Sequence, residues 1–442
     1  MLVLIVLVLA LNVAHLRAYD YISPFDEYAH VDSVDRGSRG QVIVQPDDQL
    51  GQETLREVAC RGSEFIPALP RCRPGRYDPT EFVYRGWNQA SAHSPWYYVA
   101  TGLGVRALRA LPGPGGLVTW ARVLGSAWLL LGLYLTLRAA DGLGLPRGPT
   151  LAALVMVAAV PAVLHASTTV NPDTSGMVGG AAVLLAVLAW ERDGRSLWLP
   201  ALGAFVCATL DTTNAVAVIV VAAYLGLRAL DARREPGETS QTNETSETSE
   251  TSEGVRTPGD HLRAVLAMGA GAGVGVFGWK AVYALLTPRV DLSGHPSQRI
   301  FDVDHLELET VVGRDTVFGI FPPFEGHVPT VLGNTAYLTF VGAAVLVAIG
   351  ALLSVTFGAR LSERVGTLGA ATLIGLLVSA PVLVLYNYVA DGLYFPILTR
   401  QALSAVPALA LVIASVATRR PGRVLVTGVA VGLYATALGA LL

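Results

Sequence analysis

Residues 23–32 read SPFDEYAHVD and follow directly on the apolar run that opens the chain, MLVLIVLVLALNVAHL. On a helix, Asp26 and His30 are spaced i,i+4 and Glu27 and His30 are spaced i,i+3, so the three side chains lie toward one side. A carboxylate beside an imidazole can act as a base, bind a cation or hold a substrate hydroxyl. The stretch therefore has the residue types of a catalytic or binding site.

Helix capping offers a purely structural account of the same stretch. Ser23 would be the N-cap and Pro24 the first helical residue, with the two acids in the first turn. A second acidic turn, TTVNPDTSG, fits this account equally well, because Asn171 would cap a helix that the next proline starts and Asp173 follows. In a soluble protein, capping would be the favoured interpretation of both motifs.

The composition indicates a membrane protein that crosses the bilayer many times. Of 442 residues, 52% are hydrophobic and 15% are charged, whereas a soluble protein would have roughly 25% charged residues. Apolar runs of about 17–25 residues predict an all-α polytopic bundle of about eleven spans plus one interfacial or re-entrant helix. The predicted spans are 1–17, 117–137, 150–167, 174–190, 197–211, 214–230, 263–286, 332–354, 366–386, 402–418 and 423–442.

The first apolar run lacks a basic segment before it and a small-residue cleavage site after it. We therefore expect a retained signal-anchor span. The formal net charge of −3 is too small to indicate a nucleic-acid partner. The lipid bilayer is the partner that the composition predicts.

The arginines predict which side of the membrane each loop occupies. Short cytoplasmic loops are enriched in Lys and Arg, and the arginines of this chain cluster in alternate loops: Arg138 and Arg147; Arg192 and Arg195; Arg228, Arg233 and Arg234; Arg360 and Arg364; Arg419, Arg420 and Arg423. If these loops are cytoplasmic, then the stretch 18–116, the turns at Asp173 and Asp211, the loop 287–331 and the segment 387–401 are extracytoplasmic.

This assignment requires that the segment 94–111, SPWYYVATGLGVRALRAL, does not span the membrane. Arg106 and Arg109 lie on its otherwise apolar helix, which favours an interfacial or re-entrant position. A true span would invert every later loop and place the arginine clusters outside.

Three regions follow from this pattern: an N-terminal transmembrane core (1–230) with a long extracytoplasmic loop (18–116), a disordered cytoplasmic linker (231–262), and a C-terminal transmembrane region (263–442) with an extracytoplasmic loop (287–331). The linker is a repeat of Thr, Ser and Glu without core-forming residues.

Three cysteines exclude a disulfide scaffold and a four-cysteine zinc site. Cys60 and Cys72 lie in the stretch predicted to be exported, where a disulfide is permitted, and the sequence leaves their pairing open. Cys207 falls within a predicted span and suits a small core position.

Location separates chemistry from capping for the two acidic motifs. Both motifs fall at the outer ends of spans, on the same side of the membrane, and Asp211 lies at that face as well. A charge near hydrocarbon costs about 2.5–3.5 kcal/mol at the bilayer centre and less at the interface, so it usually has a function. The polar chemistry is concentrated at one membrane face.

The order of these motifs resembles that of the GT-C superfamily of polytopic membrane glycosyltransferases. An Asp-Glu pair just beyond the first span is followed by a long outer loop and by HSPWYY, residues 93–98. The family pattern is His-Pro-Pro-hydrophobic-Tyr-Tyr, and Ser94 replaces its first proline. Asn171-Pro172-Asp173 resembles the second acidic motif. The resemblance is clearest over residues 1–230, and the composition suggests a bacterial member of the actinobacterial type.

The resemblance implies inverting transfer of a sugar from a polyprenyl-phosphate donor to an envelope glycan, lipid or protein acceptor on the extracytoplasmic face. Asp26 would be the general base, with Glu27 beside it. Asp173, His30 and His93 would position the acceptor or a metal. Some family members use a divalent cation such as Mg or Mn and others do not, so Asp26 and Asp173 are the possible ligands of such an ion.

The leaving phosphate needs positive charge or hydrogen-bond donors. Two basic residues lie at the outer ends of spans: Lys280, the only lysine, and Arg400, in PILTRQALSAVP. The resemblance downstream of residue 230 rests on Arg400, which is favoured over Lys280 as the phosphate contact. For both residues the alternative is a side chain that snorkels to the interface.

Two other functions compete with the transferase. A transporter or flippase of a lipid-linked envelope precursor would bind near the membrane midplane, between internal repeats, and the sequence has no convincing repeat and no ionisable residue near the centre of a span. A noncatalytic scaffold would use the outer loop to bind another protein, and the paired acidic motifs argue against it.

Overall fold

The computed structural model describes most of the chain. The residues outside its description are 25, 65–68, 92, 113–114, 194–195, 235–255, 288–306, 308–310, 312–329, 359–362, 392–393 and 395–398. The predicted linker 231–262 and the predicted loop 287–331 therefore lie largely outside the described residues.

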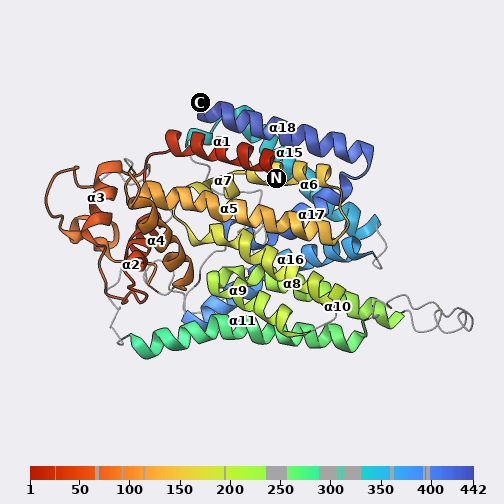
Figure 1. Ribbon diagram of the computed structural model, residues 1–442. Helices are drawn as coiled ribbons and strands as arrows, with labels where there is room; N and C mark the ends of the chain where they lie inside the picture. Colours follow the sequence, from red (N-terminus) through yellow and green to blue (C-terminus); the bar gives the residue numbers. More distant parts are fainter. Residues whose placement is uncertain are drawn as a thin grey trace, which may run out of the picture.

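The described residues form a helical bundle without a β-strand, and each predicted apolar segment is helical in it (Figure 1). The bundle consists of α1 (Leu2–Ala18), α5 (Leu117–Gly142), α6 (Arg147–Ala158), α7 (Pro161–Thr168), α8 (Gly176–Asp193), α9 (Trp198–Leu210), α10 (Ala215–Arg234), α11 (Pro258–Leu286), α15 (Thr335–Gly358), α16 (Arg364–Asp391), α17 (Val406–Val416) and α18 (Arg420–Leu441). The predicted all-α polytopic fold is confirmed.

Seven of the described helices are long and apolar enough to cross a membrane. Helices α6 and α7 form an eighth candidate that is bent by 69°, and three shorter apolar helices, Leu2–Ala18, Trp198–Leu210 and Arg400–Val416, match the remaining predicted spans. Proline at 161 starts α7 and explains the break, because a proline cannot donate its backbone N–H to the preceding turn.

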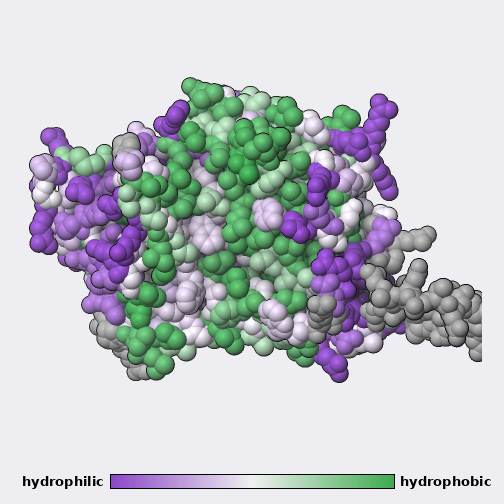
Figure 2. Space-filling model, in the orientation of Figure 1, coloured by the Kyte–Doolittle hydropathy of each residue, from purple (hydrophilic) through white to green (hydrophobic). Residues whose placement is uncertain are grey.

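The surface of the bundle is that of a multi-pass membrane protein. Figure 2 shows a hydrophobic band between two hydrophilic ends. Large apolar side chains of the helices are exposed, among them Leu266 at 73% and Phe277 at 60% on α11. Such a surface would be unfavourable in water, whereas lipid makes it the expected outer layer.

The stretch between α1 and α5 folds into a small helical module at one end of the bundle (Figure 1). It contains α2 (Glu27–Ser38), α3 (Gln52–Arg61), two 3₁₀ turns, η1 (Pro79–Glu81) and η2 (Val83–Gly86), and α4 (Trp96–Arg109). The module has a hydrophobic core of its own, distinct from that of the bundle.

The predicted interfacial or re-entrant helix 94–111 corresponds to α4. This helix has 14 residues, fewer than the roughly 20 that a membrane crossing requires, and it packs between α2 and α5. The contact with α2 is close, since a Cβ at Gly102 would lie 2.5 Å from both Ser38 N and Val34 O. Helix α4 therefore belongs to the module.

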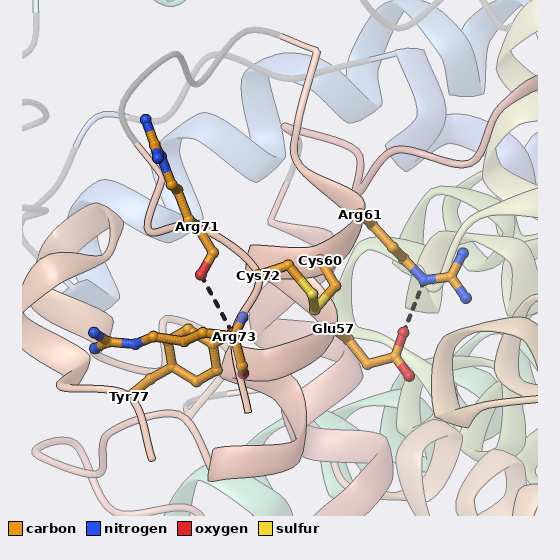
Figure 3. Close-up of a disulfide and its surroundings, with 7 residues drawn as sticks. All are labelled: Glu57, Cys60, Arg61, Arg71, Cys72, Arg73 and Tyr77. Carbon is orange, nitrogen blue, oxygen red and sulfur yellow. Dashed lines mark hydrogen bonds and ion pairs between the residues drawn. A yellow bond between two sulfur atoms is a disulfide. The ribbon is translucent and has the colours of Figure 1, made fainter. Parts of the chain in front are cut away.

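A disulfide between Cys60 and Cys72 ties α3 to the following loop (Figure 3). The two Cα atoms are 4.4 Å apart. Beyond the bridge, Tyr77 Oη accepts a hydrogen bond from Arg73 N at 2.7 Å and donates to the Arg71 carbonyl at 3.4 Å. The structure answers the question of cysteine pairing that the sequence left open.

The opposite end of the bundle carries predicted cytoplasmic loops. Glu191, at the end of α8, is buried there and accepts a hydrogen bond from Tyr224 Oη at 2.8 Å. Arg228 Nε lies 3.5 Å and His261 Nε2 3.7 Å from the same carboxylate. These contacts join α8, α10 and α11 at this end.

Glycines on α8 allow the 3₁₀ segment η6 (Thr399–Ala405) to approach closely. A Cβ on Gly180 would collide with the Ser404 carbonyl oxygen, and a Cβ on Gly176 would lie 2.9 Å from Ser404 N. Because η6 carries Arg400, this contact sets how closely the backbone of that segment lies to α8.

Gly180→Ala should therefore destabilise the fold by about 1–3 kcal/mol, the usual cost of overpacking. The matched control is Gly226→Ala in α10, where nothing lies within 4 Å of an added Cβ. That change should be neutral or stabilise the helix by up to about 1 kcal/mol. Unfolding temperatures of the two variants in one detergent check this, and equal temperatures would contradict the close contact.

Candidate functional site

Residues from five segments converge where the bundle meets the module. They are Asp26 before α2, His93 before α4, Asp173 in η3 (Pro172–Ser175), Asp211 before η4 (Thr212–Asn214), and Arg400 in η6. The structure thus brings together four of the predicted site residues with Asp211, for which no role is predicted from the sequence.

Asp173 and Arg400 form an ion pair at the module end of the bundle. Arg400 Nε lies 3.1 Å from Asp173 Oδ2, and the two side chains are 12% and 8% exposed. Asn171 holds the acid in place, because its side-chain oxygen accepts a hydrogen bond from Asp173 N at 2.9 Å. The predicted cap of the second acidic turn is confirmed. Capping and charge pairing both act at this turn.

Asp211 and His93 form a second pair. Asp211 Oδ1 accepts hydrogen bonds from Thr213 N and Thr213 Oγ1 at 2.8 and 2.7 Å, and Oδ2 lies 3.5 Å from His93 Nδ1. Burial lowers the pKa of His93, but the hydrogen bond and charge of Asp211, with Asp173 and Asp26 beyond it, raise the pKa above its usual value. The imidazole is therefore inclined to carry a positive charge.

His30 lies behind His93 and is oriented by an aromatic hydroxyl. Its Nδ1 is 2.8 Å from Tyr98 Oη, and its ring centroid is 5.5 Å from that of His93. Burial, together with the charges of His93 and Arg400, holds the pKa of His30 well below its usual value. His30 is therefore neutral at physiological pH and supports the position of His93 without adding charge.

Asp26 occupies the N-cap position of α2 with φ of 60° and ψ of 9°, a left-handed conformation, and its side chain makes no capping hydrogen bond. Asp is one of the few residues other than glycine that adopt this conformation, which still stores about 1–3 kcal/mol of strain. The structure corrects the capping account here, since Ser23 and Pro24 precede the helix and do not begin it.

Burial raises the pKa of Asp26, and the charges of Arg400 and His93 and a hydrogen bond from Tyr28 oppose that rise in part. A carboxyl group with a raised pKa accepts a proton more readily than an ordinary one. This property suits a general base.

Glu27 points away from Asp26 into a buried ion pair with Arg122. Glu27 Oε1 accepts hydrogen bonds from Arg122 Nε and Val170 N, both at 2.8 Å. Glu27 Oε2 accepts from Arg122 Nη2 at 2.8 Å and from Ser23 N at 2.6 Å. The two side chains are 1% and 2% exposed, so this carboxylate is fully engaged in holding the chain together.

Sequence reasoning missed Arg122. This arginine also donates to the carbonyl oxygens of Tyr19 and Tyr21, at 2.8 and 2.5 Å. These hydrogen bonds fix the position of the chain just after α1. The signal for its role was present in the sequence: a single arginine within the apolar run LVTWARVLGS at the start of α5. An arginine in such a run needs a buried acidic partner.

Lys280 lies in a different setting from Arg400. Its Nζ stands 4.7 Å from the ring centroid of Tyr386, so it contributes to the contact between α11 and α16. Arg400, in contrast, contacts Asp173 directly.

A divalent cation held by Asp26 and Asp173 stays a prediction. In the part of the chain that the structure describes, no group of three or more His, Cys, Asp or Glu side chains is arranged to hold a metal ion. Asp173 faces the Arg400 guanidinium and Asp211 faces His93, so basic side chains stand where a cation would approach these carboxylates.

Comparison with solved structures identifies the fold. The chain is similar to the crystal structure of ArnT from Cupriavidus metallidurans bound to undecaprenyl phosphate, with a TM-score of 0.50 and 14% sequence identity over 94% of this chain and 60% of that chain. The apo structure of the same protein gives a TM-score of 0.48 and 13% identity, over 94% of this chain and 59% of that one.

The chain therefore spans about 60% of the length of ArnT, and the likeness shows that it shares the helical fold of that protein. It gives no support to the actinobacterial subtype. No protein-family model matches the sequence, and no curated protein matches it.

Arg122→Met should cost about 3–5 kcal/mol of stability, because it leaves the Glu27 carboxylate buried without a counter-charge. Adding Glu27→Gln should recover part of this loss. Asp26→Asn should change stability by less than about 1 kcal/mol, since Asn also tolerates the left-handed conformation. Chemical unfolding in detergent measures all three variants against Asp47→Asn, an exposed control. If Arg122→Met lost no more stability than the Asp47→Asn control, the role of this ion pair would be contradicted.

Proposed function

We propose that this protein transfers a sugar, with inversion, from a polyprenyl-phosphate donor to an envelope glycan, lipid or protein acceptor at the extracytoplasmic face. The observation that carries the proposal is the convergence of Asp26, the Asp173–Arg400 pair and the His93–Asp211 pair at one end of a membrane bundle. The similarity of the fold to ArnT, solved with undecaprenyl phosphate, supports it.

Two independent features support an extracytoplasmic site. The arginine-rich loops predicted to be cytoplasmic follow α5, α8 and α10, at the ends of these helices that lie away from the module. The module beside the site contains the Cys60–Cys72 disulfide, and disulfides persist in oxidising compartments.

We assign the donor phosphate to Arg400. A polyprenyl tail would lie in the bilayer and leave its phosphosugar at the interface, at the end of the bundle where η6 lies. A planar guanidinium with several donors suits two phosphate oxygens better than an ammonium does. Asp173 contacts Nε of this guanidinium and so would orient the fork toward the phosphate.

Asp26 is the proposed general base. The acceptor hydroxyl gives its proton to the Asp26 carboxylate as its oxygen attacks the anomeric carbon. The bond from that carbon to the phosphate oxygen breaks, and its electron pair leaves with the polyprenyl phosphate, whose charge Arg400 stabilises. Glu27 has a structural role, and His30 and His93 position groups around the acceptor. No step in this scheme passes through a divalent cation.

A transporter or flippase would bind its substrate near the midplane. Asp173 and Asp211, the ion-paired carboxylates of the site, lie at helix ends on the module side of the bundle instead. Chemistry at one face accounts for this arrangement better than transport does.

The first test incubates the purified protein with a panel of polyprenyl-phosphate sugars and measures release of polyprenyl phosphate. Asp26→Asn should fold normally and reduce turnover about 10²–10⁴-fold, whereas Asp47→Asn should leave turnover unchanged. Because the base must be ionised and burial raises its pKa, the wild-type rate should fall as the pH drops through that raised value. Full turnover in Asp26→Asn would remove Asp26 from the mechanism, and no release with any donor would contradict the proposed function.

The second test measures affinity for undecaprenyl phosphate in one detergent at one ionic strength. Arg400→Lys keeps the charge but loses the bidentate fork, so affinity should fall at least about tenfold, and Arg400→Ala should lose more. Lys280→Ala should bind normally. If Lys substitutes freely at 400, the arginine only snorkels. A large loss in Lys280→Ala alone would move the phosphate contact to that residue.

A further inference from the structure

A small cavity opens beside the site on the side of the hydrophilic module. Its polar lining comes from Ser33 of α2, Gln41, Ser91, His93 and Tyr98 of α4. The cavity holds about 10 Å³, which is the space that one water molecule, or one hydroxyl group of that size, requires.

Two residues separate this cavity from the acidic cluster. His93 lines the cavity and contacts Asp211 through Nδ1. Tyr98 lines it as well, and its hydroxyl lies against His30. The His93 side chain is 39% exposed, whereas that of Asp211 is 3% exposed. An incoming group would therefore meet the imidazole before it could reach the buried acids.

Charges face His93 from every element packed around it: Asp211 before η4, Asp173 in η3, Asp26 before α2 and, further off, Arg400 in η6 through its pair with Asp173. Neutral His30 stands edge-on to its ring. The imidazole is thus held by the Asp211 carboxylate at Nδ1, and Nε2 is its second polar atom. A ring fixed in this way can direct one hydrogen bond toward a bound hydroxyl.

We propose that this cavity receives a hydroxyl of a glycan acceptor, one that neighbours the reacting hydroxyl, an inference that rests on the proposed transferase function. His93 hydrogen-bonds this neighbouring hydroxyl, and Asp211 holds the ring in place. A sugar has hydroxyl groups beside the reacting one that can enter a cavity of this size, whereas a serine or threonine acceptor has only its reacting hydroxyl. The residues that line the cavity all belong to the module, and its space of about 10 Å³ is too small for an acyl chain.

The test introduces a thiol at the cavity with Ser91→Cys. The chain offers a favourable background, because Cys60 and Cys72 are bonded to each other and Cys207 is buried. Right-side-out membrane vesicles are treated with a membrane-impermeant methanethiosulfonate reagent and supplied with the donor that is active in the panel. Two quantities are measured: sugar transfer to the glycans of the vesicle, and affinity for undecaprenyl phosphate.

Ser91→Cys should be labelled from outside. The labelled protein should transfer sugar at least about tenfold more slowly, while its affinity for undecaprenyl phosphate stays within about twofold of the unlabelled value. Gln41→Cys, at the exposed edge of the cavity, should behave in the same way and serves if Ser91→Cys fails to fold. The matched control is Arg56→Cys on α3, which is exposed and remote from the cavity lining. It should be labelled without effect on transfer.

Normal transfer after labelling of Ser91→Cys would overturn the proposal. A parallel loss of undecaprenyl-phosphate affinity would assign the cavity to the donor and overturn it too, as would label reaching neither cavity cysteine from outside. Failure of the proposed function is separate, since the unmodified wild type would then release no lipid phosphate. Label incorporation tests access to the cavity even in that case.

Discussion

The buried ion pair between Glu27 and Arg122 is the interaction on which the site depends. Two charges inside a membrane bundle are tolerated only when their hydrogen-bonding capacity is satisfied, and here the carboxylate accepts four hydrogen bonds. These hydrogen bonds connect the segment after α1, the start of α2 and the segment before Asp173, where Val170 N is one of the donors. As Glu27 turns inward, Asp26 is left in the left-handed conformation at the edge of the site.

The neighbouring acids of the site have different environments and therefore suit different roles. Asp173 and Asp211 each form an ion pair with a basic side chain, whereas Asp26 has a hydrogen bond from Tyr28. Such separation of environments is how a protein assigns one carboxyl group to proton transfer and others to positioning. The close packing of η6 on the glycines of α8 places Arg400 among these acids.

The helices could be predicted from the sequence because a membrane crossing demands a long apolar run, and runs such as 117–137 and 332–354 have few competing interpretations. Asp26, Asp173 and Arg400 could be singled out by their place at span ends. The division of labour between Asp26 and Glu27 could not, since adjacent acids look alike until Arg122 is known to lie across from one of them. The pairing of His93 with Asp211 likewise depends on packing between distant segments. The prediction of Ser23 as an N-cap was wrong, because Ser23 precedes the helix and its backbone N–H donates to the buried Glu27 carboxylate.

The central claim is that Asp26, Asp173 and Arg400 surround one phosphosugar at the module end of the bundle. An electron cryomicroscopy structure of the full chain with undecaprenyl phosphate bound in a lipid nanodisc tests it most directly. The account predicts phosphate density within hydrogen-bond reach of the Arg400 guanidinium, about 2.7–2.9 Å from its nitrogens, with the Asp26 carboxylate facing the same space. Phosphate density beside Lys280, or at the arginine-rich end of the bundle, would contradict it.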